Sequence, residues 1–284
     1  MNDGDPAAAP DLADDAEIRR PHVPLGAKPQ GGLGADFIMA LRFFSRLPSG
    51  DSPHEVPDLN RIAMALPLAS VAIGIGPGLL LIGAALLGLP AFFAAALAVG
   101  AAVMAGGAMA EDALADSADG LFGGSTRERR LEIMKDSRHG TYGVAALCLF
   151  LVLRVVGIGS VAAINPLAAS AIWLAAGIAG RSGALWLAVA LAPARTDGAA
   201  ATAGRLQKRS FAIGAVLGLM LLFVLAGPPT SVLALALAVV AAVAVIAGWT
   251  ALCQRLVAGQ TGDLIGALGA LLEITVLTAL LLFV

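Results

Sequence analysis

The stretch from residue 62 to residue 110 contains no charged side chain. One helix needs about 20 apolar residues to cross a bilayer, so this stretch is long enough for two crossings. The whole chain has the same character, since 58% of its 284 residues are hydrophobic and only 13% are charged. A typical soluble domain carries about 25% charged residues. The sequence therefore predicts an all-α fold, a polytopic integral membrane helical bundle.

Polar breaks divide the chain into about seven predicted transmembrane helices. They cover residues 62–88, 89–110, 143–163, 165–192, 211–227, 231–252 and 264–284. All but two of the 18 Lys and Arg residues lie in the N-terminal region and in the segments 111–142, 193–210 and 253–263. With seven spans, these polar segments all lie on one side of the membrane. Because loops rich in Lys and Arg stay in the cytoplasm, we expect a multi-pass protein with a cytoplasmic N-terminus.

Residues 1–35 differ from the rest of the chain, because they are rich in Asp, Ala, Pro and Gly and contain no apolar run. This composition predicts a disordered cytoplasmic tail rather than a signal peptide, which needs an apolar core of about 7–15 residues. Residues 36–284 are expected to form a single transmembrane catalytic domain with its site segment at 111–142. The 18 basic and 20 acidic residues nearly balance, so nothing indicates nucleic-acid binding.

The acidic segment EDALADSADG, which follows the uncharged stretch, holds the first candidate site. Asp112, Asp116 and Asp119 are spaced i, i+4, i+7, so they fall on one face of a helix. Carboxylates gathered at the cytoplasmic end of a membrane span repel one another and are costly to leave unpaired. Mg²⁺ prefers carboxylate oxygens and commonly bridges to substrate phosphates. The stripe therefore predicts a Mg²⁺ site, and a solvated acidic helix end is the alternative.

A second charged segment follows a Gly-rich turn. Ser125 and Glu128 have the capping-box spacing, which predicts a helix over TRERRLEIMKDS that ends near His139. This helix would carry a second acidic stripe facing the first, made of Glu128, Glu132 and Asp136, with Lys135 on the same side. Carboxylates, a metal and guanidinium groups together suit phosphoryl transfer. A surface lattice of salt bridges is the alternative, and a single His beside a helix end more often has a structural role.

Three charged residues lie inside predicted spans: Arg154, Arg181 and Glu273. A charged side chain is expensive within the bilayer, so each should face the interior of the bundle. We expect Glu273 to form an ion pair with at least one of the two arginines. For an arginine near a helix end, extension of the side chain to the membrane surface is the alternative.

Several stretches together resemble the cobalamin synthase family, the adenosylcobinamide-GDP ribazoletransferases. They are RFFSRLP, ADSADG, LEIMKDSRHGTYG, LAPARTDG and GQTGDLIGALGALLE, and the resemblance covers nearly the whole chain after residue 36. It implies a Mg²⁺-dependent phosphotransferase of the bacterial inner membrane that acts in the last assembly stage of cobalamin. The charge pattern predicts that its site lies on the cytoplasmic face. The implied substrates are adenosylcobinamide-GDP and α-ribazole or its 5′-phosphate, with release of GMP. Membrane lipid, further copies of the chain and other enzymes of the pathway are the other expected partners.

The resemblance and the charge pattern together suggest a role for each residue of the site segment. Asp112, Asp116 and Asp119 are expected to hold Mg²⁺ against the diphosphate. Asp136, supported by Glu132, is expected to position a second ion or to accept the proton of the attacking hydroxyl. The residues expected to stabilise the leaving GMP are Lys135 and Arg138.

Outside this segment, the expected substrate-binding residues are Arg181, Arg195, Thr261, Asp263 and Glu273. Asp263 opens the last predicted helix, so helix capping is its alternative role. The family pattern usually has a His where this chain has Ala110 and a Gly where it has Ala113. These departures leave the three aspartates of the stripe intact.

Other functions stay open at this point. An intramembrane prenyltransferase, or another enzyme that uses Mg²⁺ on a diphosphate, also places aspartates at helix ends, but a prenyltransferase normally has its two motifs in separate halves of the chain. A CDP-alcohol phosphotransferase shares the D-x-x-D-G pattern but continues differently after it. A membrane transporter would explain charges inside spans, yet it should bind its substrate near the membrane midplane.

Overall fold

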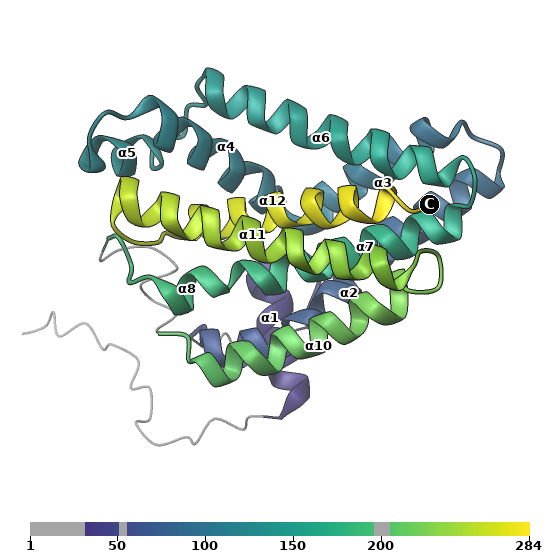
Figure 1. The fold of residues 1–284 in the computed structure, drawn as a ribbon, viewed down its shortest axis with the longest axis horizontal. Helices are drawn as coiled ribbons and strands as arrows, with labels where there is room; N and C mark the ends of the chain where they lie inside the picture. Colours follow the sequence, from purple (N-terminus) through teal and green to yellow (C-terminus); the bar gives the residue numbers. More distant parts are fainter. Residues whose placement is uncertain (1–31, 51–55, 196–204) are drawn as a thin grey trace, which may run out of the picture. The chain divides into compact units, whose positions relative to one another are not determined.

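The computed structural model describes residues 32–50, 56–195 and 205–284, and they form an all-helical bundle (Figure 1). The helices are α1 (Leu33–Phe44), α2 (Leu59–Leu86), α3 (Ala91–Gly106), α4 (Met109–Gly123), α5 (Arg127–Ile133), α6 (Thr141–Ala162), α7 (Pro166–Ala184), α8 (Trp186–Ala190), α10 (Lys208–Ala226), α11 (Val232–Val257) and α12 (Gly262–Leu281). The predicted all-α fold is confirmed. Of the predicted tail, residues 1–31 lie outside the described residues and residues 33–35 lie in α1.

Six of these helical segments are long and apolar enough to cross a membrane: α2, α6, α7 together with α8, α10, α11 and α12. They match six of the predicted spans, with ends that differ by a few residues. Polar side chains set several of the starts. The side chain of Asp58 accepts a hydrogen bond from the backbone of α2, Asn165 does the same for α7, and Thr261 does so for α12. Such caps satisfy N–H groups that have no partner within the helix.

The prediction that the remaining span, residues 89–110, forms a single helix is wrong. Helix α3 ends at Gly106, α4 begins at Met109, and the two helices are bent by 85°. Gly107 and Ala108, which connect them, have left-handed φ angles of 64° and 56°, and this conformation ends an α-helix. Hydropathy does not reveal such a break, because the residues around it are uncharged. The described chain therefore has six spans, or seven if the bent pair counts as one.

The bend between α3 and α4 is covered by the segment that follows α1. The backbone N–H of Arg46 donates to the carbonyl oxygen of Ala105 at 2.8 Å. A Cβ atom on Gly107 would lie 2.5 Å from Cγ of Arg46. Position 107 therefore requires glycine both for its positive φ and for space. Helix α1 packs against α2, and its predicted location in the membrane interface stays a prediction.

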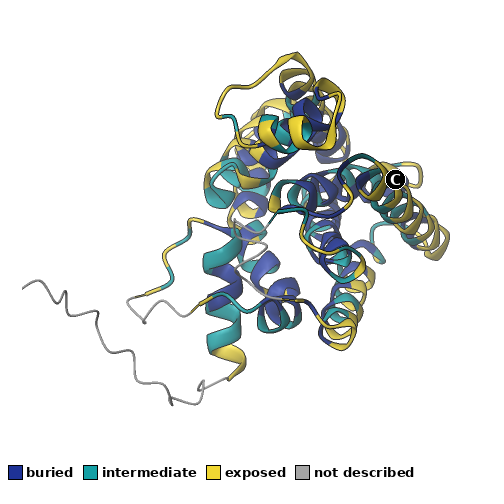
Figure 2. Ribbon diagram, turned by 90° about the vertical axis from the view of Figure 1, so that its left-hand side faces the viewer, coloured by how far each residue is buried: buried dark blue, intermediate teal, exposed yellow. Residues whose placement is uncertain are grey.

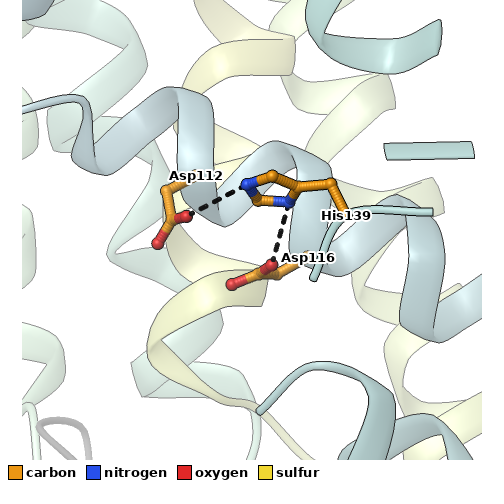
Figure 3. Close-up of side chains that lie close together, drawn as sticks. All are labelled: Asp112, Asp116 and His139. Carbon is orange, nitrogen blue, oxygen red and sulfur yellow. Dashed lines mark ion pairs between the residues drawn. The ribbon is translucent and has the colours of Figure 1, made fainter. Parts of the chain in front are cut away.

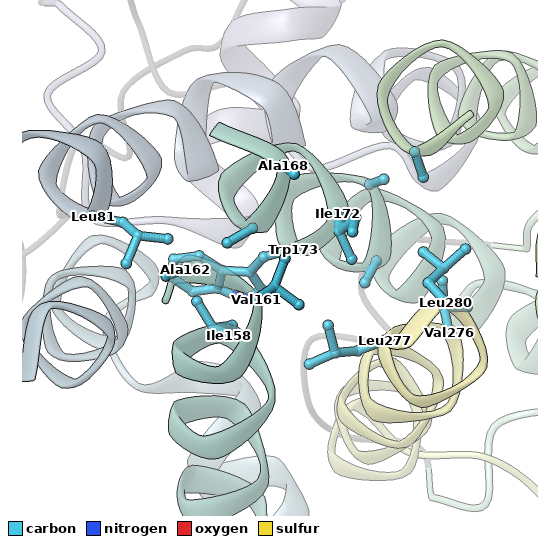
Figure 4. Packing of buried hydrophobic residues seen from close by; sticks show 14 of the residues in the cluster. Leu81, Ile158, Val161, Ala162, Ala168, Ile172, Trp173, Val276, Leu277 and Leu280 are labelled. Atoms are coloured by element: carbon cyan, nitrogen blue, oxygen red, sulfur yellow. The ribbon is translucent and has the colours of Figure 1, made fainter. Parts of the chain in front are cut away.

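Helix α12 lies inside the bundle and packs against α4, α7 and α11 (Figure 1). Buried side chains from α6, α7 and α12 meet in the largest hydrophobic cluster, where Trp173, Ile158 and Leu277 are among the residues (Figure 4). By contrast, many apolar side chains of α10 and α11 are exposed. In Figure 2 the ribbon is yellow where residues are exposed. Extended apolar surfaces of this kind are typical of contact with lipid.

The polar segments gather at one end of the bundle, which contains α4, α5, the start of α6, the end of α11 and the start of α12 (Figure 1). Arg127 donates to the carbonyl oxygen of Ala194 at 3.3 Å, and Arg130 donates to that of Leu256, also at 3.3 Å. These bonds connect the predicted polar segments 111–142, 193–210 and 253–263. Within the described residues, the three segments therefore lie together, as the charge pattern predicts.

Candidate active site

Helix α4 carries the acidic stripe and is held between α6 and α12. Asp112 is exposed, whereas the side chain of Asp116 retains only 15% of its accessible surface. His139, from the loop that leads into α6, reaches over both (Figure 3). Its Nε2 lies 3.9 Å from Oδ1 of Asp112, and its Nδ1 lies 3.7 Å from Oδ1 of Asp116. One ligand atom from each of the three side chains lies within 4.8 Å of the other two.

The third aspartate of the predicted stripe, Asp119, has different partners. Its Oδ2 accepts a hydrogen bond from the backbone N–H of Gly140 at 2.6 Å, and its Oδ1 accepts one from Gly143 at 2.9 Å. Asp119 is 7% exposed. Among the described residues, the group suited to a metal ion therefore contains two of the three predicted aspartates together with a histidine that the sequence had favoured as structural.

A fourth carboxylate, that of Asp263, also acts electrostatically on Asp116, as do Asp112, Asp119 and His139. Asp263 lies in the first turn of α12. Several negative charges thus surround one half-buried carboxylate, and a cation placed among them would relieve their repulsion.

Asp263 is also held by Arg195, whose Nη2 donates to its Oδ2 at 2.8 Å. The segment of Arg195 is joined to the start of α12 by two backbone hydrogen bonds, from Gln260 to Ala192 at 2.9 Å and from Ala194 to Gln260 at 2.8 Å. The Nη1 atom of Arg195 is buried and has no hydrogen-bond partner among the described residues. The structure therefore brings two of the expected substrate-binding residues, Arg195 and Asp263, together beside the acidic stripe.

Thr261 is buried and acts as the N-cap of α12, where its Oγ1 accepts a hydrogen bond from the N–H of Leu264 at 3.2 Å. Its hydroxyl also lies 3.3 Å from Oδ2 of Asp263. The capping role that the sequence left open for Asp263 belongs to Thr261 instead. Substrate binding by Thr261 stays a prediction.

The predicted second acidic stripe does not form. Helix α5 is capped by Thr126, one residue later than predicted, and it ends at Ile133, before Asp136. Glu132 pairs with Arg129 at 2.8 Å on the exposed surface. The predicted helix was too long, because the capping signal at Ser125 and the spacing of the charges extend beyond the seven residues that form the helix.

Asp136 forms an ion pair with Arg138 instead of facing the first stripe, with Oδ2 2.6 Å from Nη2. Hydrogen bonds from the side chain and backbone of Arg138 lower the pKa of Asp136 to about 2, so its carboxylate is a weak base. The same pair raises the pKa of Arg138. Lys135 is exposed on the same turn. Among the described residues, neither carboxylate of this predicted catalytic set, Glu132 or Asp136, belongs to the group around His139.

A second cluster of charged side chains lies deeper in the bundle, with Arg154 of α6 at its centre. Nη1 of Arg154 donates to Oε1 of Glu111 at 2.8 Å, and Nε lies 2.9 Å from Oε1 of Glu273. The indole Nε1 of Trp173 donates to the same oxygen of Glu273 at 2.9 Å. The predicted pairing of Glu273 with an arginine is confirmed.

Glu111 is the member of this cluster that sequence reasoning missed. The predicted spans contained two arginines and one glutamate, so one positive charge lacked a partner. Glu111 directly follows the uncharged stretch and supplies the missing negative charge to Arg154. The excess positive charge was therefore a usable signal.

Arg181 also borders this deep cluster. It lines a cavity together with Arg154, Trp173 and Glu273, and its Nη1 donates to the carbonyl oxygen of Gly177 at 3.3 Å. Glu273 follows Asp263 by ten residues, which corresponds to about 15 Å along α12. The structure thus separates two predicted substrate-binding residues, Glu273 and Arg181, from the group around Asp116.

Comparison with known proteins agrees with the sequence resemblance. A family model described as cobalamin-5-phosphate synthase matches residues 36–281. A protein from Azorhizobium caulinodans is 44% identical over 88% of this chain and 96% of its own length. One from Xanthobacter autotrophicus is 41% identical over 88% of this chain and 97% of its own length. Both are named adenosylcobinamide-GDP ribazoletransferase. No solved structure matches the chain significantly.

Proposed function

The chain belongs to the cobalamin-5-phosphate synthase family, and we propose that it transfers adenosylcobinamide phosphate from adenosylcobinamide-GDP to α-ribazole or its 5′-phosphate. The family itself supports cobalamin synthase activity, a transferase reaction in the final assembly of cobalamin. The substrates in the proposal agree with the name that the relatives carry. The observation that carries the site assignment is the gathering of Asp112, Asp116 and His139 at the polar end of the bundle.

In the proposed reaction, a hydroxyl oxygen of the ribazole forms a bond to the phosphorus attached to cobinamide. The bond from that phosphorus to the oxygen bridging the two phosphates breaks, and this oxygen leaves on GMP with the electron pair. The hydroxyl proton passes to solvent water. Phosphoryl transfer of this kind depends mainly on positioning and on neutralisation of charge, and these are the tasks left to the protein.

The donor set of Asp112, Asp116 and His139 fits a divalent cation, because two carboxylates balance a charge of +2 and the three ligand atoms lie close together. We propose Mg²⁺, which binds through few carboxylates and shares its other positions with water and phosphate oxygens. A bound cation supplies neutralisation and orientation of the diphosphate. Nη1 of Arg195, which has no hydrogen-bond partner in the described part of the chain, is a further donor suited to a phosphate oxygen.

The apolar helices indicate a multi-pass membrane protein. We propose that it resides in the bacterial inner membrane with its polar end in the cytoplasm. This orientation is supported by the Lys and Arg residues gathered at that end. The diphosphate substrate would then meet the acidic helix α4 from the aqueous side.

The decisive experiment compares Asp116→Asn with wild-type protein in membranes, measuring GMP release that requires both substrates over a Mg²⁺ titration. We expect a loss of about 100-fold or more, since removal of a ligand forfeits several kcal/mol of charge stabilisation. Glu128→Gln, the same chemical change on the exposed surface of α5, should stay within about two-fold of wild type. Near wild-type turnover of Asp116→Asn at normal expression would refute the metal site.

A further inference from the structure

Asp119 ends the acidic stripe in sequence but serves the start of α6 in the structure. Both of its carboxylate oxygens accept backbone N–H groups, from Gly140 and Gly143. Gly140 is the N-cap residue of α6, and Gly143 lies in its first turn. The first N–H groups of a helix lack partners within the helix and favour a negative charge. Asp119 of α4 therefore caps a different helix from the one that carries it.

The contact with Asp119 requires glycine at positions 140 and 143. A Cβ atom on Gly140 would lie 2.6 Å from Oδ1 of Asp119. A Cβ atom on Gly143 would overlap both the carboxylate of Asp119 and the carbonyl oxygen of Ala115. In the motif HGTYG, the two glycines therefore leave room for the carboxylate of Asp119 to accept both N–H groups.

This contact also determines where His139 lies. His139 directly precedes Gly140, and one peptide unit spans only about 3.8 Å between Cα atoms. When Asp119 holds the N–H of Gly140, the imidazole is brought to 3.9 Å from Asp112 and 3.7 Å from Asp116. Helices α4 and α6 also pack against each other, but among the described residues the hydrogen bond from Gly140 to Asp119 is the one next to His139 in the chain.

We propose that Asp119 is a positioning residue, which acts on the metal site only through His139, and that His139 is the third donor of that site. Charge balance supports this division. Asp112 and Asp116 together neutralise a divalent cation, while the charge of Asp119 is matched by the N-terminus of α6. The proposal rests on the metal site of the proposed function.

The test is a double-mutant cycle on the purified full-length protein, with Mn²⁺ as the probe and free Mn²⁺ followed by electron paramagnetic resonance. Asp119→Asn and His139→Ala are each expected to weaken Mn²⁺ binding by about 10–100-fold. The double variant should bind no more weakly than His139→Ala alone, because the two residues act as one unit. Effects that multiply in the double variant, or an unchanged affinity of Asp119→Asn, would overturn the proposal.

Gly143→Ala tests the same contact without changing any polar side chain. It should displace Asp119 and weaken Mn²⁺ binding to about the level of Asp119→Asn. Gly123→Ala is the matched control, because its Cβ would meet only Ile133 at an ordinary 3.9 Å; its affinity should equal that of wild type. If Asp119→Asn does not fold by circular dichroism, the cycle is run with Gly143→Ala in its place.

Asp116→Asn separates this proposal from the proposed function. If Asp116→Asn binds Mn²⁺ as tightly as wild type, the metal site itself is wrong, and the role of Asp119 in it falls too. If Asp116→Asn loses binding while Gly143→Ala and Asp119→Asn retain it, the metal site stands and only the positioning role is rejected.

Discussion

At the scale of single residues, the acidic stripe of α4 shows how neighbouring elements decide the environment of each side chain. Asp112, Asp116 and Asp119 share one helical face, yet the first is exposed, the second is half-buried and the third is bonded to another helix. Ala113 shows the same dependence on neighbours. It stands where the family pattern usually has Gly, and it fits because Gly266 opposite has no Cβ, which would lie 2.5 Å from that of Ala113.

Asp136 gives a prediction about pH. Its pKa is lowered to about 2 by Arg138, below the usual value of about 3.9, so the carboxylate is ionised throughout the range from about pH 5 to pH 9. Any stability it contributes is present above about pH 4 and is lost as pH falls through about 2. Asp136→Asn should therefore leave the pH dependence of kcat/KM between about pH 5 and pH 9 as it is in the wild type. A changed pH dependence in the variant would identify Asp136 as the general base.

At the scale of elements, the deep cluster joins the helix of the acidic stripe to the rest of the bundle. Arg154 of α6 binds Glu111 of α4 and Glu273 of α12, and Arg181 of α7 lines the same cavity. The four charges sum to zero. Helices α4 and α12 bring Asp116 and Asp263 to the polar end, so this neutral cluster helps to hold the two acid-bearing helices in register.

Charge balance makes this cluster testable. Glu111→Gln leaves a net positive charge in the bundle and should cost about 3–5 kcal/mol, as breaking a buried pair does. Adding Arg181→Gln restores neutrality without replacing the lost contact. We expect the double variant to unfold at a higher temperature in detergent than Glu111→Gln alone. A double variant that is destabilised by the sum of the two single changes would show that net charge is not what the cluster balances.

At the scale of the whole molecule, the bundle has one polar end and one short-looped, largely uncharged end. The connection between α6 and α7 contains the exposed residue Ile164, and α6 has 22 residues, about 33 Å of helix. Lys135 lies in the turn between α5 and α6, at the other end of that length. The two positions should therefore lie on opposite sides of a membrane.

Cysteine labelling tests this arrangement. With Cys148 and Cys253 replaced by alanine, an impermeant maleimide added to spheroplasts should modify Ile164→Cys but not Lys135→Cys. Inverted membrane vesicles should give the reverse result, because the positively charged end stays in the cytoplasm. Labelling of both positions from the same side would contradict the topology, and with it the cytoplasmic site.

The sequence by itself determined the class of fold, six of the seven predicted spans, the gathering of polar segments at one end and the pairing of Glu273. These features depend on hydropathy and on spacing within one helix, or on the cost of an unpaired charge in an apolar interior. The family resemblance depends likewise on local motifs. Each of these signals is contained in short stretches of chain.

Only the tertiary structure decided which carboxylates meet which partners. Residues 107 and 108 turn α4 away from α3 by 85°, and hydropathy gives no sign of such a turn. That turn brings Glu111 into contact with Arg154, and it brings Asp119 into contact with the start of α6. His139 joins Asp112 and Asp116 because a loop returns to α4 after α5. Contacts between separate helices depend on the angles at which they pack, and no spacing within one helix contains those angles.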